Sequence, residues 1–297
     1  MSGIKLIFSI KDLENITGIK AHTIRIWEKR YNLLTPKRTD TNIRFYDNDS
    51  LKKLLNIVLL NKNNYKISKI AEMTSEEIML NARELANINL IDDEAINAFK
   101  LAMFQFDKVL FHKTYNELAQ KKTFRDIFKD IFTPFLHQIG LLWHTETLLT
   151  SHEHFISNLI TQKIQINTEK LELNVSNRAT TYVLFLPENE MHEVGLLYLN
   201  YELVLRGYQT IYLGPSLPLN NLDYFFKNNK DLCFITSMTI EPHDNKLMEY
   251  FNKIDAILKH SEHEFIAFGR KTEALINHKF DSNIRLYATI SEFLKNL

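Results

Sequence analysis

The stretch from residue 16 to residue 54 reads ITGIKAHTIRIWEKRYNLLTPKRTDTNIRFYDNDSLKKL. Ser9, just before it, can cap a first helix that Gly18 ends, and a second helix is expected from about His22 to Tyr31. Two helices joined by a tight glycine-containing turn form a helix-turn-helix. The alternating run Ile43-Arg44-Phe45-Tyr46, after a polar turn, predicts a β-hairpin wing beside them.

Positive charge is concentrated in the first quarter of the chain. The 297 residues carry no formal net charge, but residues 1–75 hold 10 Lys and 4 Arg against 4 Asp and 3 Glu, so this segment carries +7 and the remainder −7. A basic segment attached to an acidic body is typical of a head that binds a polyanion. Charge alone leaves DNA, RNA and a membrane surface open as partners.

The second helix has an apolar side and a basic side. Ile24 and Trp27 fall on one side, and Thr23, Arg25 and Arg30 on the other. Outward Thr and Arg suit a helix in the major groove, because Arg bonds guanine edges or phosphates and Thr packs on bases. A solvated basic helix is the alternative, and composition does not separate the two. We expect Trp27 to belong to the core.

The order of these residues resembles the winged-helix N-terminus of the MerR family over about residues 7–75. The shared motifs are a Thr-x-Arg-x-Trp-Glu-x-Arg-Tyr run, a Pro-x-Arg before the wing and an Arg-x-Tyr in it. The resemblance implies that the partner is double-stranded operator DNA, contacted or positioned by Thr23, Arg25, Arg30, Tyr31, Arg38, Arg44 and Tyr46. Thr41-Asn42 stands where the family often has Gly-Gly, which predicts a stiffer wing turn.

The sequence pattern changes twice along the chain. After the wing, Asp47 or Asp49 caps a third helix, and from about 76 to 172 apolar residues recur at helical spacing with almost no Gly or Pro, as in a bundle of four helices. Beyond residue 177 the apolar runs TYVLFL, TIYLG, LCFITS and EFIAFG alternate with amphipathic helical stretches. That alternation is typical of a parallel sheet with helices on both faces.

These patterns predict three domains. We expect a winged helix-turn-helix of MerR type over residues 1–75, a four-helix bundle that serves as a cap over 76–175, and a Rossmann-like, doubly wound parallel sheet over 178–297. The fold class is therefore multidomain, α and α/β.

A histidine follows the first strand of the predicted sheet, in the loop Pro187–Gly195. In a doubly wound sheet this loop binds ligands, and Glu190 could orient His192 as a metal ligand, although an ordinary loop histidine is the more frequent case. The loop resembles the Asp-x-His-x-x-Gly motif of cobalamin-binding domains, with Glu190 for Asp and Gly195 at its end. Ser237-Met238-Thr239 resembles that family's Ser-x-Leu motif, after the 41 intervening residues that the family shows.

This resemblance implies a role for each matching residue. His192 would be the lower axial cobalt ligand with Glu190 behind it. Ser237 would bond the displaced dimethylbenzimidazole, and Thr239 would line the same slot. The family's third motif is a Gly-Gly pair that admits the nucleotide tail, and the corresponding Phe268-Gly269 keeps only its second glycine. A benzyl group there narrows the slot.

The helical segment carries a further motif. Trp143-His144 and, after an interval, Glu153-His154 are similar to the Trp-x9-Glu-His motif in the cap bundle of light-sensing cobalamin repressors of the CarH and LitR type. The similarity implies that Trp143 shields the upper ligand, that His144 coordinates cobalt after photolysis, and that Glu153 and His154 contact the adenosyl group or the corrin. The alternative is a helix junction with solvated histidines.

Two functions remain in contention. The first is a repressor that assembles as a dimer or tetramer around adenosylcobalamin in the dark, occupies its operator, and dissociates when light breaks the cobalt–carbon bond. The second keeps DNA binding without the cofactor: Phe268 blocks the tail, and the C-terminal half serves dimerisation or binds a partner protein. Both predict a regulator with no catalytic residues.

The composition disfavours a cobalamin enzyme and a metal sensor, and it predicts where the protein is located. A cobalamin enzyme such as a methyl carrier would leave the DNA-binding head without a role, and a MerR metal sensor needs more cysteines than the single Cys233. Cys233 is expected in a buried strand. No run of about 18 apolar residues and no signal-peptide pattern occurs, so we expect a cytoplasmic, nucleoid-associated protein without a membrane partner.

Overall fold

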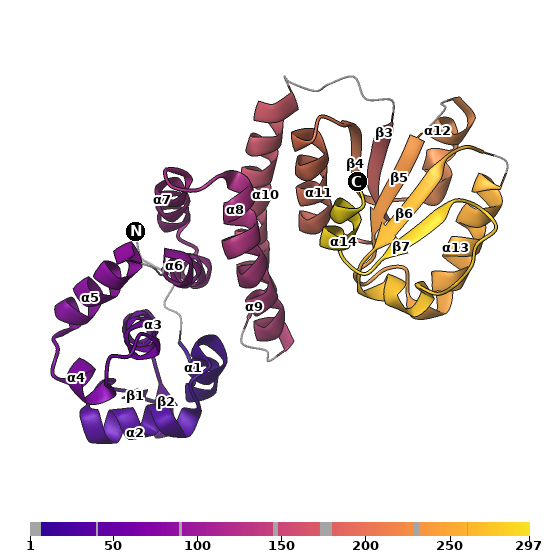
Figure 1. Ribbon diagram of the computed structural model, residues 1–297. Helices are drawn as coiled ribbons and strands as arrows, with labels where there is room; N and C mark the ends of the chain where they lie inside the picture. The colour runs from indigo at the N-terminus through magenta and orange to yellow at the C-terminus, as the bar shows by residue number, and fades with distance from the viewer. Residues whose placement is uncertain are drawn as a thin grey trace. The chain divides into compact units, whose positions relative to one another are not determined.

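The computed structural model describes residues 7–39, 41–88, 91–144, 148–172, 180–228, 232–259 and 261–297, with the backbone alone at 83–88, 91–92, 141, 143–144, 172, 227–228 and 270. Its contacts divide the chain into two compact units, residues 1–159 and 160–297. Figure 1 shows the elements of both. Among the described helices, none is long and apolar enough to cross a membrane.

The helix-turn-helix begins with a helix that is capped at both ends. α1 (Ile10–Thr17) starts at Ser9, where the side chains of Ser9 and Asp12 each accept a hydrogen bond from the other's backbone N–H. It ends at Gly18, whose φ of 75° closes the helix in the left-handed region. α2 (Ala21–Tyr31) follows directly. The predicted pair of helices and the glycine between them are confirmed.

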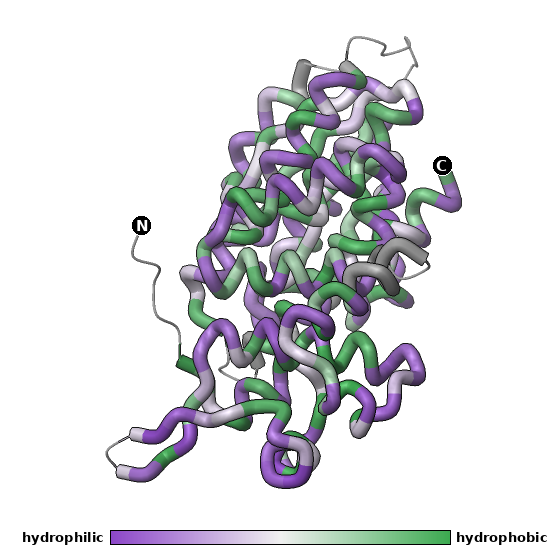
Figure 2. Tube along the Cα trace, turned by 90° about the vertical axis from the view of Figure 1, so that its left-hand side faces the viewer, coloured by the Kyte–Doolittle hydropathy of each residue, from purple (hydrophilic) through white to green (hydrophobic). Residues whose placement is uncertain are grey.

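The wing is a short antiparallel hairpin of β1 (Lys37–Arg38) and β2 (Arg44–Phe45). In Figure 2 it protrudes from the head and is coloured mostly hydrophilic. Asn42 in its turn has a φ of 65°, a conformation that Asn adopts more readily than most residues other than Gly. Tyr46 fixes the base of the hairpin through an antiparallel bridge to Phe8, with both N–O distances 2.8 Å.

The remaining helices of the first unit follow the wing. α3 is capped by Asp47, whose carboxylate accepts from the Ser50 N–H at 3.0 Å, so the cap is Asp47 and not Asp49. The elements are α3 (Asn48–Lys62), α4 (Ile67–Ala71), α5 (Ser75–Ile88), α6 (Ile91–Gln105), α7 (Lys108–Ala119), α8 (Phe124–Ile127), a π-helical segment (Phe128–Phe132), α9 (Thr133–His144) and α10 (Thr150–Glu172).

One helix in this segment lies outside the expected four. α5 packs against α3 of the head as well as against α6, because Ile78 and Ala82 turn inward. The expectation of four helices therefore fits α6, α7, the run from α8 through α9, and α10. Phe99 lies at the centre of an aromatic cluster there, with ring centroids 5.0 Å from Phe111 and 5.3 Å from Phe132. α10 runs across the division between the two units.

The second unit contains a five-stranded parallel sheet in the order β4-β3-β5-β6-β7. Its elements are β3 (Thr181–Pro187), α11 (Val194–Leu205), β4 (Gln209–Leu217), a 3-10 turn (Leu219–Leu222), α12 (Asp223–Asn228), β5 (Leu232–Ser237), α13 (Asp244–Leu258), β6 (Glu264–Phe268), a second 3-10 turn (Arg270–Leu275), β7 (Ile284–Tyr287) and α14 (Ile290–Lys295). The strands β3 to β6 coincide with the four predicted apolar runs, so the predicted α/β fold is confirmed, while β7 was not foreseen.

Both faces of the sheet are covered, as continuous apolar strands require. Leu184, Ile235 and Phe268 face one core with residues of α11 and α14. Phe185, Phe234 and Phe265 face the opposite core with residues of α13. Cys233 is buried in β5, as expected, and burial raises the pKa of its thiol to about 12. The carboxyl ends of β3 and β5 therefore lead side by side into the loops that carry the predicted site.

Candidate functional site

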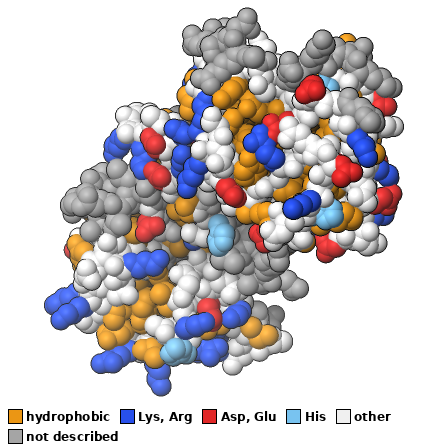
Figure 3. Space-filling model, turned by 45° about the vertical axis from the view of Figure 1, so that its right-hand side comes forward, with side chains coloured by type: hydrophobic (Ala, Val, Ile, Leu, Met, Phe, Trp, Pro, Cys, Tyr) orange, Lys and Arg blue, Asp and Glu red, His pale blue; other side chains and the backbone are white. Residues whose placement is uncertain are grey.

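The second helix of the head buries one side and exposes the other. Ile24 and Trp27 are buried, so Trp27 belongs to the core as expected. Arg25 and Arg30 are exposed on the opposite side, and Thr23 is half-buried. Figure 3 shows Lys and Arg side chains gathered along the lower edge of the molecule, where α2 lies.

The two wing arginines are exposed and already oriented by neighbours. The Arg38 guanidinium donates to the side-chain oxygen of Asn42 at 2.7 Å, which fixes it across the turn of the hairpin. The Arg44 Nε lies 3.9 Å from a carboxylate oxygen of Glu28 on α2. A cationic surface therefore extends from the helix onto the wing, as binding to a phosphate backbone requires.

The two tyrosines predicted at this site lie below the surface. Tyr46 is fully buried and its hydroxyl donates to Glu28, and burial together with that bond raises its pKa well above the usual range. Tyr31 is half-buried beneath the Arg30 guanidinium, 5.4 Å from its ring centroid. Their placement suits residues that position the arginines.

Glu28 is a residue of this candidate interface that the sequence analysis did not single out. Its carboxylate meets Tyr46 and Arg44, so it joins the second helix to the wing. Its only signal in the sequence was its place in the Trp-Glu-x-Arg-Tyr run.

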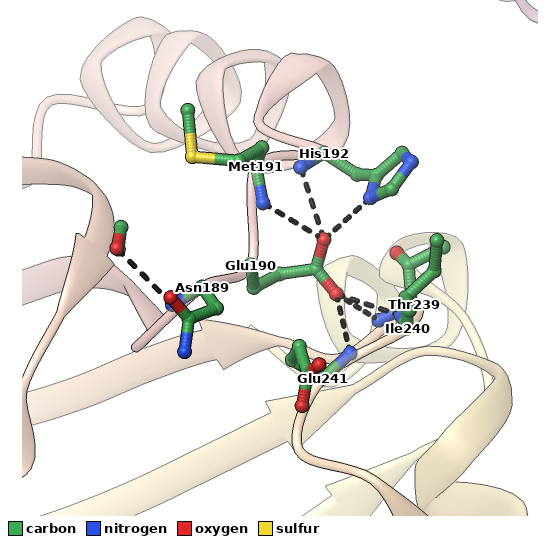
Figure 4. A network of polar contacts seen from close by, with 8 residues as sticks. Asn189, Glu190, Met191, His192, Thr239, Ile240 and Glu241 are labelled. Carbon is green, nitrogen blue, oxygen red and sulfur yellow. Dashed lines mark hydrogen bonds and ion pairs between the residues drawn. The ribbon is translucent and has the colours of Figure 1, made fainter.

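A buried carboxylate organises the loop after β3. Glu190 is 1% exposed, and its Oε1 accepts from the Met191 and His192 N–H groups, both at 3.0 Å. The same oxygen lies 2.5 Å from His192 Nδ1 (Figure 4). The Glu190–His192 pair that the sequence predicts is therefore formed in the structure.

The other oxygen of Glu190 holds the loop after β5. Its Oε2 accepts from three consecutive backbone N–H groups, those of Thr239 at 3.0 Å, Ile240 at 2.7 Å and Glu241 at 3.0 Å. Burial alone would raise the pKa of Glu190, but the hydrogen bonds from His192 and from these backbone groups outweigh it and lower the pKa to about 2. An ionised carboxylate thus ties two neighbouring loops together.

Ser216 of β4 and Gly195 are the remaining residues at the loop that follows β3. The Ser216 hydroxyl accepts from the Asn189 N–H at 3.1 Å, and its own N–H donates to the Glu190 carbonyl at 3.1 Å. Ser216 carries no sequence signal, because its contact depends on the pairing of β3 with β4. At Gly195 an added Cβ would meet only Ile290, at 3.7 Å, so packing does not demand a glycine there. Its predicted role beside a ligand is compatible with that open space.

The residues predicted to hold the nucleotide tail do not form an open slot. Ser237 is buried and pairs across the sheet with Phe268, which is 3% exposed and packs into the core on the α11 face. Thr239 is exposed, and its backbone is bound to Glu190. The axial-ligand part of a corrinoid site therefore fits these residues, whereas the tail part does not.

The predicted cap residues are only partly described. The side chains of Trp143 and His144, near the end of α9, lie outside the described residues. On α10, Glu153 accepts from the Ser157 hydroxyl at 2.8 Å, and His154 Nε2 lies 3.5 Å from Glu153 Oε2 with most of its side chain exposed. The structure thus brings Glu153 and His154 together as a polar pair.

A third histidine beside this pair is buried instead. His152 stacks on Phe106, with ring centroids 4.8 Å apart, and its Nε2 finds no hydrogen-bond partner among the residues that the structure describes. Burial lowers the pKa of His152. The sequence analysis assigned it no role.

Two segments of the chain match the models of known protein families. Residues 8–77 match the model of MerR HTH family regulatory proteins, and residues 95–166 match the model of the B12 binding domain. The chain is a DNA-binding regulator whose N-terminal domain is similar to the MerR type. The B12 model covers the helical segment with the cap motif of the regulator, while the loop of Glu190 lies beyond the matched residues.

Two curated relatives agree with this assignment. The regulator is 25% identical to the HTH-type transcriptional repressor CarH of Myxococcus xanthus over 221 residues, which span 72% of the regulator and 73% of the relative. It is also 25% identical to the repressor CarA of the same organism, over 70% of the regulator and 68% of that protein. Both relatives are transcriptional repressors, in line with the prediction of a regulator that is not an enzyme.

A solved structure supports the fold. The monomethylamine corrinoid protein of Methanosarcina barkeri aligns with a TM-score of 0.57 over 69% of the regulator and 97% of that chain. At 13% identity, the likeness bears on the α and α/β architecture alone.

Proposed function

We propose that adenosylcobalamin and light control DNA binding by this regulator. The contact between Glu190 and His192 Nδ1 at 2.5 Å carries the proposal, because a carboxylate behind an imidazole is the arrangement that orients a metal-binding histidine. The match of residues 95–166 to the B12 binding domain supports it independently.

Different residues of the chain are assigned to different parts of adenosylcobalamin. His192 would supply the imidazole ligand to cobalt, with Glu190 holding its Nδ1. Adenosylcobalamin, when bound, supplies a cobalt–carbon bond that green light can break. Trp143, His144 and the Glu153–His154 pair are assigned to its upper side. Of these, His144 is the second candidate ligand for cobalt.

Control of DNA binding follows from a change of assembly. A ligand shifts an equilibrium only if it binds one state more tightly than the other, so adenosylcobalamin must favour a dimer or tetramer in the dark. In that state two or more basic heads occupy the operator together, and repression ends when the assembly dissociates in light.

One observation favours a second candidate function. Phe268 fills the side of the sheet on which Ser237 lies, where the resemblance places the nucleotide tail. A regulator without a cofactor, whose C-terminal half serves dimerisation or binds a partner protein, would need no open slot there.

The two candidates differ in a visible spectrum. The purified protein is incubated with adenosylcobalamin, desalted in the dark and measured before and after green illumination, together with its molecular mass in solution. A retained corrin band that shifts with light, and a mass that falls with it, would support the proposal. The absence of a retained band would favour the cofactor-free regulator.

Two histidine variants test the ligand assignment. His192→Ala is expected to lose most of the retained band, because it removes the lower ligand. His243→Ala is the matched control: His243 also follows a glutamate by two residues, and its Nε2 lies 3.3 Å from Glu241. Unchanged retention in His192→Ala, or equal loss in both variants, would contradict the assignment of His192.

A further inference from the structure

Two neighbouring residues of the sheet decide how a corrinoid can enter this domain. Ser237 ends β5 and Phe268 ends β6, and the two are partners in the parallel register. Side chains alternate along a strand, so both lie on the face that α11 and α14 cover. Ser237 therefore has the Phe268 ring as its direct neighbour.

The space beside Ser237 is filled by packed side chains. Phe268 is 3% exposed and belongs to one core cluster with Leu186, Leu196 and Ile235. From α11, Leu196, Leu199 and Leu203 belong to this cluster, so the helix packs directly on this face of the sheet. A core packed in this way leaves no room for a ribose phosphate and its base without displacing side chains.

Backbone packing alone explains why a glycine follows Phe268. Gly269 has a φ of 118°, and an added Cβ would lie 2.5 Å from the Met238 carbonyl oxygen. The close approach of these two backbones explains why glycine stands here. The one glycine that remains of the predicted pair thus needs no ligand to account for it.

Two apolar side chains are exposed on the loops that Glu190 holds together. Met191, next to His192, is 63% exposed, and Ile240 in the loop tied to Glu190 is 51% exposed. The His192 side chain is itself 51% exposed. Exposed apolar side chains on the loop that carries the imidazole, and on the loop bound to it, suit a largely apolar ligand such as a corrin ring.

We propose that the regulator holds corrinoids by the ring and the axial histidine alone, and that the nucleotide tail stays outside the sheet domain because Phe268 occupies its slot. The inference rests on the proposed corrinoid function and adds the ligand class: corrinoids with or without a nucleotide, including cobinamide. Phe268 is the residue that sets this preference.

The test compares two ligands that differ in the tail. Dissociation constants of adenosylcobalamin and adenosylcobinamide are measured in the dark by absorption titration of the wild-type protein, of Phe268→Ala and of Phe265→Ala. Phe265 is the matched control, because it is a fully buried phenylalanine on the same strand that faces the opposite core. Loss of stability alone would affect both variants.

The expected result is that the wild type binds adenosylcobinamide at least as tightly as adenosylcobalamin. Phe268→Ala should tighten adenosylcobalamin selectively, by about tenfold, because its tail gains a slot, and Phe265→Ala should leave the ratio unchanged. Wild-type binding of adenosylcobalamin about tenfold or more tighter than adenosylcobinamide would overturn the tail-free mode while the corrinoid function stood. Retention of neither ligand by the wild type would overturn both.

Discussion

Glu190 is a buried carboxylate that the fold keeps ionised. Five backbone N–H groups and an imidazole point at its two oxygens, and together they outweigh the cost of burial. Its pKa is lowered from 4.5 to about 2, so the carboxylate favours folding wherever it is charged. The stabilisation is present above about pH 4.5 and is lost as the pH falls towards 2.

The first prediction concerns Glu190→Gln. Glutamine keeps one acceptor oxygen but places an NH2 group against backbone donors, so we expect a loss of about 2 kcal/mol at pH 7. The difference from wild type should shrink between pH 4.5 and pH 2, because the wild-type carboxylate is then protonated. Denaturant unfolding at several pH values measures it. A difference independent of pH would show that the charge of Glu190 plays no part.

At the scale of elements, the recognition helix and the wing act through one junction. Glu28 of α2 contacts both Tyr46, which follows β2, and Arg44 within it. The cations of the two elements therefore have a fixed relative position, with Arg25 on the helix and Arg44 on the hairpin. A surface of this kind binds DNA with strong dependence on salt.

The second prediction concerns these cations. Arg25→Ala and Arg44→Ala should each weaken operator binding by about tenfold or more, because each removes a contact to a base edge or a phosphate. Lys253→Ala is the control: it removes the same charge from an exposed pair with Glu249 outside the head. Affinity is measured by fluorescence anisotropy at several salt concentrations, with circular dichroism to follow folding. Equal affinity in all three variants would remove both arginines from the interface.

At the scale of the whole molecule, the segment that matches the MerR model contacts the segment that matches the B12 model. The Lys100 ammonium on α6 donates to the Ile16 carbonyl of α1 at 3.2 Å, and Phe104 meets Phe8 edge to face at 5.4 Å. Lys100 is buried, and burial lowers its pKa to about 8. Through these contacts, changes in the helical segment can reach the head.

The third prediction tests this junction. The folded pKa of Lys100 lies below its ordinary value of 10.5, so burying the charged form costs stability below about pH 8, and that cost is relieved as the pH rises to 10.5. In the wild type this raises the free energy of unfolding by about 3 kcal/mol between pH 8 and pH 10.5, and Lys100→Met should abolish that rise. Unfolding at pH 7.5 and pH 10 measures it, with the exposed Lys113→Met as control. Identical pH dependence in wild type and Lys100→Met would place the ammonium in solvent.

The sequence predicts the local parts of this architecture and misses the distant ones. Caps and turns such as Ser9 and Gly18 are local, and each of the strands β3 to β6 shows its own apolar run, whereas the four-residue β7 does not. The three donors to Glu190 Oε2 lie 49 to 51 positions away, and they are backbone groups that leave no pattern in the side chains. The filled space beside Ser237 likewise depends on the pairing of β5 with β6, so the sequence could flag Phe268 but not place its ring.

The way Glu190 holds the second loop leaves that loop free to vary. A backbone N–H is the same for every residue except proline, so the tie does not depend on which side chains stand at 239, 240 and 241. Those three positions can be randomised as a library while the loop stays anchored beside His192. The backbone hydrogen bonds to Glu190 thus stay constant while the side chains at 239–241 vary, and variants with a new ligand preference can be selected among them.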